Sequence, residues 1–243
     1  MYGVAKVTGD SALQTDVLED LSDARRYRAW LADLARPHLG EHPIEIGSGT
    51  GEYALEWAPA LTAFTATEAD ESRHRGLVDR FADHDVIRVR YLLLGDLDDD
   101  PPAATARHSA AVAFNVLEHI PDDVAALRAM GALVRPGGAV ILIVPAFPSA
   151  MSRFDRAIGH QRRYTRLSLG TALAGAGLRV EQLRYVNPIG LINWYVTVKA
   201  LGMRPRNGAA LRLFDRTVVP VARSLDRVSV PFGQSVFAVA RVP

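Results

Sequence analysis

The chain has no cysteine, so it can form neither a disulfide bond nor a thiolate metal site. It has no apolar run long enough to span a bilayer, and its first residues lack the basic and apolar segments of a signal peptide. Only two of its 28 basic residues are lysine, and no repeat or low-complexity stretch is present. These absences make the cytoplasm the expected location and argue against stable insertion in a membrane.

What the chain does contain is enough apolar material for one α/β domain. Apolar side chains make up 49% of the 243 residues, which suits a full core. The net charge of +1 hides an uneven division, with 13 basic against 23 acidic residues in 1–150 and 15 against 4 in 151–243. On one interpretation the acidic half binds a cationic cofactor and the basic half an anionic acceptor or a membrane surface. On the other, the two halves neutralise each other within one fold.

Short apolar runs alternate with helical patterns from residue 44 onward. Each run is apolar throughout, as in the strands of a parallel sheet that is covered on both faces. Right-handed crossovers would make such a sheet doubly wound. Strands are predicted at 44–47, 63–67, 86–94, 110–114, 139–144, 178–186 and 235–241. We expect a single domain, 1–243, with an N-terminal helical cap over 1–40 and a helical insertion at 187–230, before the last strand.

A glycine loop, Gly47-Ser48-Gly49-Thr50-Gly51, follows the first predicted strand. Glycines let the backbone come close to a ligand. Glu45 precedes the loop and Glu52 follows it, with no Lys or Arg between them, so the loop would repel a pyrophosphate and attract a cation. Glu68 ends the next strand, where a carboxylate can bind the two hydroxyls of a ribose. This pattern favours S-adenosylmethionine over NAD, and a tight turn without a ligand is the alternative.

Five motifs in this order resemble those of the class I S-adenosylmethionine-dependent methyltransferases. They are Glu45 with the glycine loop, Glu68, Asp96 after the third strand, Asn115-Val116-Leu117-Glu118-His119-Ile120 after the fourth, and Arg135-Pro136-Gly137-Gly138 before the fifth. The resemblance covers about residues 10–145, and 170–186 and 235–241 fit the last two strands. It implies a Rossmann-like, mostly parallel seven-stranded sheet whose last strand is antiparallel.

The resemblance also implies a role for each matched residue around the cofactor. The glycines would wrap the methionine and ribose, Glu45 would face the ammonium group, and Glu68 would bind the ribose. Asp96 and Leu97 would meet the adenine, and Asn115 would lie beside the methionine chain. The predicted cofactor-binding residues are Glu45, Gly47, Ser48, Gly49, Gly51, Glu68, Asp96, Leu97 and Asn115. Glu118 is interpreted as a surface or structural residue.

A second motif, Gly159-His160-Gln161-Arg162-Arg163-Tyr164-Thr165, resembles a bacterial methyltransferase subgroup of poorly defined substrate. We expect 145–170 and 187–230 to lie on the acceptor side, the latter as a lid, a dimer face or a membrane contact. Methyl transfer depends mainly on alignment, and a base is needed only for a protonated acceptor. The candidate catalytic residues are His160, Tyr164 and His119. A neutral hydrogen-bonding role is the alternative for His160, and a packing or capping role for His119.

Arginines in the same segment suit a bidentate clamp for a carboxylate or phosphate on the acceptor. The alternative is a salt-bridged loop that joins the acidic and basic halves. The predicted substrate-binding residues are Arg153, Arg162, Arg163, Tyr164 and Trp194.

The predicted function is S-adenosylmethionine-dependent methyl transfer to a small, anionic or lipid-linked biosynthetic intermediate, with O-methylation favoured over N-methylation. The alternatives are an NAD-type oxidoreductase and a non-catalytic scaffold of the same fold. A homodimer through the insertion is compatible with the pattern. No nucleic-acid partner is expected, because the basic cluster lacks interleaved aromatic residues. No metal is expected either, since the sequence reveals no compact carboxylate–histidine set beyond the cofactor positions.

Overall fold

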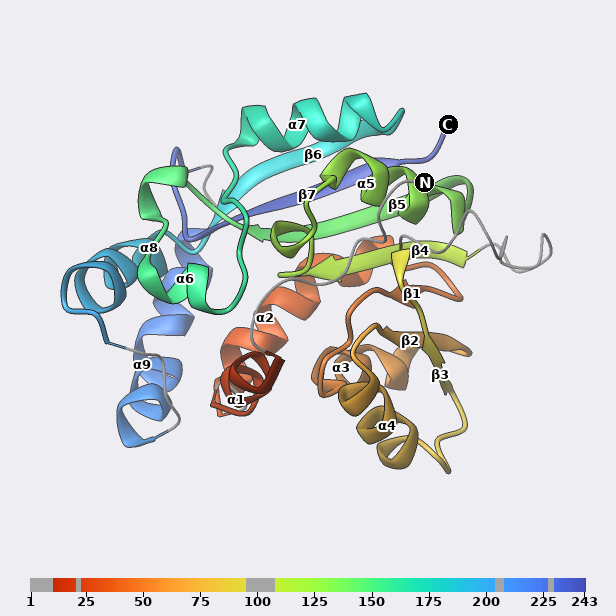
Figure 1. Cartoon of the computed structure of the whole chain (residues 1–243), viewed down its shortest axis with the longest axis horizontal. Coiled ribbons are helices and arrows are strands. Elements are labelled where there is room, and N and C mark those ends of the chain that lie inside the picture. Colours follow the sequence, from red (N-terminus) through yellow and green to blue (C-terminus); the bar gives the residue numbers. More distant parts are fainter. Residues whose placement is uncertain (1–10, 21–22, 95–107, 204–207, 227–229) are drawn as a thin grey trace.

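The computed structural model describes residues 11–20, 23–94, 108–203, 208–226 and 230–243. Within these ranges a seven-stranded sheet lies between two layers of helices (Figure 1). The strands are β1 (Ile44–Glu45), β2 (Phe64–Glu68), β3 (Ile87–Tyr91), β4 (His108–Phe114), β5 (Val134–Pro145), β6 (Arg179–Val186) and β7 (Ser235–Arg241). Their order is β3-β2-β1-β4-β5-β7-β6, and only β7 runs antiparallel to its neighbours. The predicted doubly wound, mostly parallel sheet is confirmed.

Helices occupy the stretches between the strands. The α-helices are α1 (Ser11–Asp20), α2 (Arg25–Ala35), α3 (Glu52–Trp57), α4 (Glu71–Arg80), α5 (Asp123–Ala132), α6 (Arg153–Ala157), α7 (Arg166–Gly175), α8 (Pro188–Asn193) and α9 (Ala209–Leu225). Short 3-10 helices are η1 (Arg36–His38), η2 (Ala58–Ala60), η4 (Leu117–His119) and η5 (Pro148–Ala150), and η6 (Trp194–Ala200) is a π-helix. None of the described helices combines the length and the apolar character needed to cross a bilayer.

The central strands are buried on both faces, which explains their uninterrupted apolar sequences. Along β5, Val140 and Leu142 belong to the core beneath α5 and α7, whereas Ile141 and Ile143 belong to the core beneath α2, α3 and α4. Side chains alternate between the faces of a strand, so a strand with two covered faces needs apolar residues at every position.

Several strand boundaries differ from the predicted ones, and two of the differences have a clear structural reason. Strand β1 ends at Glu45 because Gly47 adopts a left-handed conformation, with φ +70°, that turns the chain into the loop. The predicted turn 135–138 lies within β5, where the Gly138 carbonyl accepts a hydrogen bond of 3.0 Å from the N–H of Val242, the residue after β7. A Cβ at Gly138 would lie 2.6 Å from the Ser109 carbonyl oxygen, so the strand requires glycine there for close packing.

Helix α9, in the insertion, packs against the N-terminal helix α2. The Asp215 carboxylate of α9 accepts hydrogen bonds from the backbone N–H groups of Arg26 and Tyr27, at 3.0 and 2.9 Å. It thereby satisfies donors at the start of α2, whose N-cap residue has no side-chain cap of its own. Trp30 of α2 is buried against Val219 and Ala222 of α9.

Ion pairs join the acidic and basic halves of the chain. They are Arg212–Asp23 at 2.8 Å, Arg223–Asp33 at 2.9 Å and Arg162–Asp123 at 2.8 Å. At these places acidic and basic side chains neutralise each other within the fold, as the second of the two interpretations predicted.

Candidate active site

A cavity of about 340 Å³ opens at the carboxyl ends of β1, β2 and β4. Strands β1 and β4 are neighbours in the sheet. Strands β2 and β3, which follow β1 in the sequence, lie on one side of this pair, and the strands that follow β4 lie on the other side. The pair therefore marks the topological switch point, where open α/β sheets bind ligands. Figure 1 shows α6, α8 and α9 gathered beyond the end of β5 on the same side of the molecule. The insertion contributes Trp194 to the cavity wall, and α6 contributes Phe154.

The glycine loop forms one end of this cavity. Gly47, Gly49 and Gly51 all have positive φ, at +70°, +58° and +82°. The Ser48 N–H donates to the Thr67 carbonyl at 2.7 Å, which ties the loop to β2. Gly47 and Gly49 line the cavity, whereas Gly51 lies behind it and begins α3. A Cβ at Gly51 would come within 2.6 Å of the Phe81 ring, so this glycine serves packing.

Glu68, at the end of β2, accepts hydrogen bonds from the glycine loop and from the residues that follow β2. Its Oε2 accepts from the Gly49 N–H at 3.0 Å. Its Oε1 accepts from the N–H groups of Ala69 and Asp70 and from Arg73 Nη2, at 3.0, 2.9 and 3.3 Å. A carboxylate offers about four acceptor sites, so Oε1 is saturated and Oε2 retains one acceptor site on the cavity wall.

Glu45, at the end of β1, is a buried carboxylate on the cavity wall. Its exposed fraction is 2%, and its Oε2 has no hydrogen-bond partner among the described residues. Burial is the main cause that raises its pKa to about 7; the Ser48 hydroxyl acts against this increase and the nearby Glu68 adds to it. An unpartnered carboxylate in such a place is suited to a ligand that brings a positive charge.

The opposite end of the cavity is built around Asp155 of α6. Arg163 donates to Asp155 Oδ1 from Nε and Nη2, at 3.1 and 2.7 Å, and its guanidinium lies 4.5 Å from the ring centroid of Trp194. Asp155 Oδ2 accepts from the Ser152 N–H and hydroxyl, at 2.6 and 2.7 Å. Burial works to raise the pKa of Asp155, but hydrogen bonds from His160 and Arg163 outweigh it and hold this pKa below its ordinary value.

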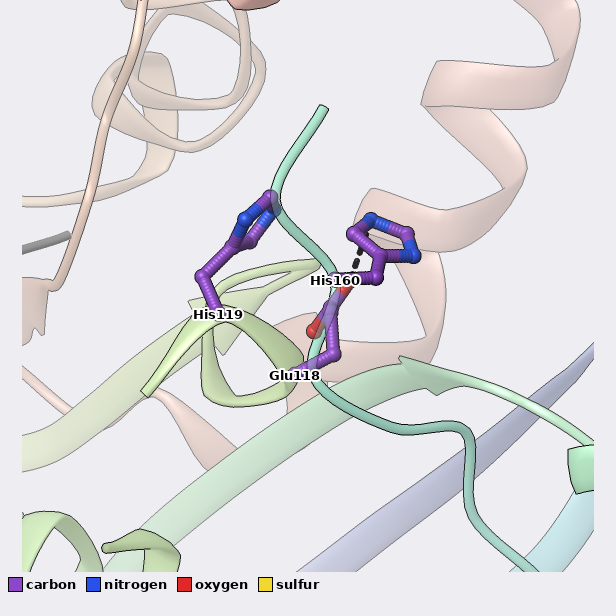
Figure 2. Close-up of side chains that lie close together, drawn as sticks. All are labelled: Glu118, His119 and His160. Carbon is purple, nitrogen blue, oxygen red and sulfur yellow. Dashed lines mark ion pairs between the residues drawn. The ribbon is translucent and has the colours of Figure 1, made fainter. Parts of the chain in front are cut away.

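Glu118, His119 and His160 lie together beside this network (Figure 2). Glu118 and His119 come from η4, and His160 from the loop after α6, which is fixed to η4 by the Gln161 N–H to Glu118 carbonyl hydrogen bond of 2.8 Å. His160 Nδ1 lies 3.0 Å from Asp155 Oδ1, and its Nε2 lies 3.7 Å from Glu118 Oε1. Burial raises the pKa of Glu118 to about 7, while His160 opposes the shift.

This cluster bears on two expectations. Of the two interpretations of Glu118, a surface position is excluded, because its exposed fraction is 0%. The fold also assembles a compact carboxylate–histidine set that the sequence did not reveal, because ligand-type atoms of Glu118, His119 and His160 lie within 4.8 Å of one another.

The structure brings most predicted site residues to the cavity wall. Those that line it are Glu45, Gly47, Ser48, Gly49, Glu68, Asn115, His119, His160, Arg163 and Trp194. Asn115 has the left-handed φ of +53° where β4 turns into η4. Asp96 and Leu97 lie outside the described residues.

The predicted arginine clamp is not assembled. Arg153 is exposed on α6, and Arg162 pairs with Asp123 and donates to the Pro121 carbonyl, so neither lines the cavity. Only Arg163 does, and its charge is balanced by Asp155. Tyr164 is 2% exposed, lies outside the cavity lining and donates to Asp123 Oδ2 at 2.9 Å. Burial, with Asp123 beside it, raises the pKa of Tyr164, which keeps the phenol protonated.

Sequence reasoning missed several residues of the cavity wall. Tyr53 of α3 and Arg73 of α4 lie near the glycine loop, and Phe154 and Ile158 lie near His160. Tyr27 of α2 also lines the cavity. These residues reach the cavity because helices from distant parts of the chain converge there, and no local motif marks them.

Comparison with known proteins identifies relatives of this architecture. The model of a family described as "Methyltransferase domain" matches residues 18–183. A putative methyltransferase from Haloferax volcanii, solved in complex with the Trm112 methyltransferase activator, has 12% identity and a TM-score of 0.62, with 92% of each chain covered. The geranyl diphosphate C-methyltransferase from Streptomyces coelicolor A3(2), solved with Mg²⁺, geranyl diphosphate and S-adenosyl-L-homocysteine, has 13% identity and a TM-score of 0.61. That match covers 88% of this chain and 77% of the other.

The [4+2]-cyclase SpnF is also similar, with 18% identity, a TM-score of 0.59, and coverage of 88% of this chain and 81% of that one. The fold therefore also occurs in a protein named for another reaction. No curated protein sequence matches the chain.

Proposed function

The chain belongs to the family of methyltransferase domains and is an S-adenosylmethionine-dependent methyltransferase, and from this premise we propose how its cavity divides between donor and acceptor. The methyl donor binds at the glycine loop, between Glu45 and Glu68. The acceptor binds between the Glu118–His119–His160 cluster and Trp194. The observation that carries the proposal is the buried Glu45 carboxylate, which lies on the cavity wall and whose Oε2 has no hydrogen-bond partner in the described part of the chain.

At the donor end the chemistry of each side chain matches a part of S-adenosylmethionine. Glu45 accepts a hydrogen bond from the ammonium group and favours the positive sulfonium nearby. The remaining acceptor site on Glu68 Oε2 receives a ribose hydroxyl. Leu92, Leu93 and Leu94 line the wall after β3 and offer an apolar surface to the adenine.

A dinucleotide suits this end poorly. Its pyrophosphate would face the carboxylates of Glu45 and Glu68, and Arg73, the cation nearest to them on the wall, is already paired with Glu68 at 3.3 Å. Like charges in a buried site cost several kcal/mol in binding free energy. We therefore favour the methyl donor over NAD(H).

At the acceptor end we propose a small molecule that presents a hydroxyl group to His119 and His160. The volume of about 340 Å³ lies near the lower limit of ligand pockets and must accommodate both substrates. The geranyl diphosphate of the Streptomyces coelicolor neighbour is likewise a small molecule. Since Arg163 is balanced by Asp155, the arginines provide no support for a negative charge on the acceptor. We propose that the insertion acts as a lid, because its Trp194 forms part of the wall.

Calorimetry with the full chain tests the donor assignment. S-adenosylmethionine and S-adenosyl-L-homocysteine should each bind one molecule per chain, and NAD(H) should bind at least tenfold more weakly. The variant Glu45→Gln should weaken donor binding, and Glu52→Gln is the matched control, because Glu52 lies outside the cavity and pairs with Arg28 and Arg80. Tight NAD(H) binding without donor binding would reverse the assignment.

A further inference from the structure

The Glu118–His119–His160 cluster has the composition and the spacing of a metal site. It offers one carboxylate and two imidazoles, with the candidate ligand atoms within 4.8 Å of one another. The imidazoles contact each other edge to face, with ring centroids 4.6 Å apart. His119 and His160 both line the cavity, so an ion held here would face a substrate.

Glu118 is the first reason to assign a ligand to this cluster. Neither carboxylate oxygen of this fully buried residue has a hydrogen-bond partner among the described residues. Burying an unsatisfied carboxylate costs several kcal/mol in folding free energy. The His160 Nε2 atom lies 3.7 Å from Oε1, beyond the ordinary hydrogen-bond range. A cation between these two atoms would satisfy the carboxylate.

His160 is the second reason, because the Asp155 carboxylate contacts its ring on the side away from Glu118. Its Nδ1 lies 3.0 Å from Asp155 Oδ1, an oxygen that Arg163 Nη2 also approaches to 2.7 Å. With Nδ1 on the side of Asp155, the ring presents Nε2 to Glu118. Metal-binding histidines commonly have such a carboxylate behind them.

One of the distances already fits a first-row divalent ion. A metal–nitrogen bond of about 2.0–2.1 Å and a metal–oxygen bond of about 2.0–2.2 Å can together span up to about 4.3 Å. The 3.7 Å between His160 Nε2 and Glu118 Oε1 lies within that limit, whereas the cluster as a whole, with ligand atoms within 4.8 Å of one another, would close slightly around an ion. Two imidazoles and one carboxylate favour a transition-metal ion over Mg²⁺ or Ca²⁺, which prefer oxygen ligands.

We propose that Glu118, His119 and His160 bind a divalent transition-metal ion whose open coordination positions face the acceptor. The role that follows rests on the proposed function. An acceptor hydroxyl that binds the ion releases its proton to solvent more readily. The oxygen then forms a bond to the methyl carbon as the carbon–sulfur bond breaks, and that electron pair stays on sulfur. The products are a methyl ether, S-adenosyl-L-homocysteine and the released proton. In this role the two histidines are ligands rather than general bases.

The test is a titration of Co²⁺ into tag-free, full-length protein that has been freed of metal with a chelator. Visible ligand-field absorption and calorimetry report binding without any turnover. The expected result is one Co²⁺ per chain, with affinity reduced at least tenfold in Glu118→Gln and in His160→Gln. The control His74→Gln, on α4 and outside the cluster and the cavity lining, should bind as the unaltered chain does. His119→Gln provides a third ligand variant at a partly exposed position if the buried substitutions prevent folding.

Two outcomes would overturn the metal site: folded, unaltered protein that binds no Co²⁺, or ligand variants that bind it as tightly as the unaltered chain. Titrating S-adenosylmethionine into the same chelated protein separates this inference from the proposed function. Donor binding without Co²⁺ binding removes only the metal site, whereas Co²⁺ binding without donor binding removes the donor assignment.

Discussion

Replacing Glu45 by glutamine tests the physical basis of donor binding, because it removes a charge and keeps the shape. The carboxyl is buried and its pKa is raised from 4.5 to about 7. Because the pKa of Glu45 is higher in the folded than in the unfolded state, the protonated carboxyl contributes its full stabilisation below the pKa of the unfolded state. That stabilisation is lost as the pH rises through about 7. Ionising Glu45 in the protein without ligand therefore lowers the free energy of unfolding.

The magnitude follows from the two pKa values. Each pH unit between them is worth about 1.4 kcal/mol, so the ionised carboxylate costs about 3 kcal/mol well above neutrality. Between about pH 5.5 and about pH 8, Glu45→Gln should gain about 2 kcal/mol of unfolding free energy relative to the unaltered chain. Glu118 also has a pKa of about 7. Because both proteins carry Glu118, the difference between them isolates Glu45.

The donor should respond in the opposite direction. A hydrogen bond to a charged group is worth about 1.5–3 kcal/mol, so Glu45→Gln should bind S-adenosylmethionine about 10- to 150-fold more weakly near pH 8. This ratio should shrink by up to about tenfold near pH 6, where Glu45 is mostly protonated. Denaturant unfolding and calorimetry at both pH values measure the two effects. Equal donor affinities of the two proteins near pH 8, or a ratio that does not change with pH, would refute the reasoning.

Three further substitutions probe other parts of the cavity. Glu68→Gln should weaken donor binding at least tenfold in calorimetry, and unchanged affinity would place the ribose elsewhere. Arg163→Ala leaves the buried Asp155 carboxylate without its arginine partner and should lower the unfolding free energy by about 3–5 kcal/mol. The control Arg162→Ala removes a more exposed arginine and should cost about 1 kcal/mol or less. Equal losses in the two variants would contradict the structural role of Arg163. Gly47→Ala should lose about 1–3 kcal/mol of stability, because its φ is +70° and the added Cβ would lie 2.8 Å from a valine methyl. The control Gly76→Ala in α4 has open space and should be neutral or stabilising, so matching denaturation midpoints would argue against the strained loop.

The sheet could be predicted because its signals are local. A strand that is covered on both faces favours apolar residues at successive positions, and the run 139–144 of β5 shows this directly. The glycine loop could be predicted for a similar reason, since backbone conformations with positive φ select glycine. The order of these motifs along the chain was therefore sufficient to predict that Glu45, the glycine loop and Glu68 lie together, and all three contribute to the cavity wall.

The acceptor end could not be predicted in the same way, because it depends on side-chain pairing across distant segments. Glu118 and His160 are separated in the sequence by α5, β5 and α6, and only the docking of the loop after α6 onto η4 brings them together. Arg163 looked available for a substrate because the sequence does not show that the intervening turns fold it back onto Asp155. Hydrophobic periodicity carries no information about such pairings.

The most direct test of the central claim is a crystal structure of the chain with S-adenosyl-L-homocysteine. The account predicts that the amino group of the ligand lies within hydrogen-bond distance of Glu45 Oε2 and that a ribose hydroxyl lies at Glu68 Oε2. A ligand bound elsewhere, or bound with its carboxylate against Glu45, would contradict the assignment of this cavity to the methyl donor.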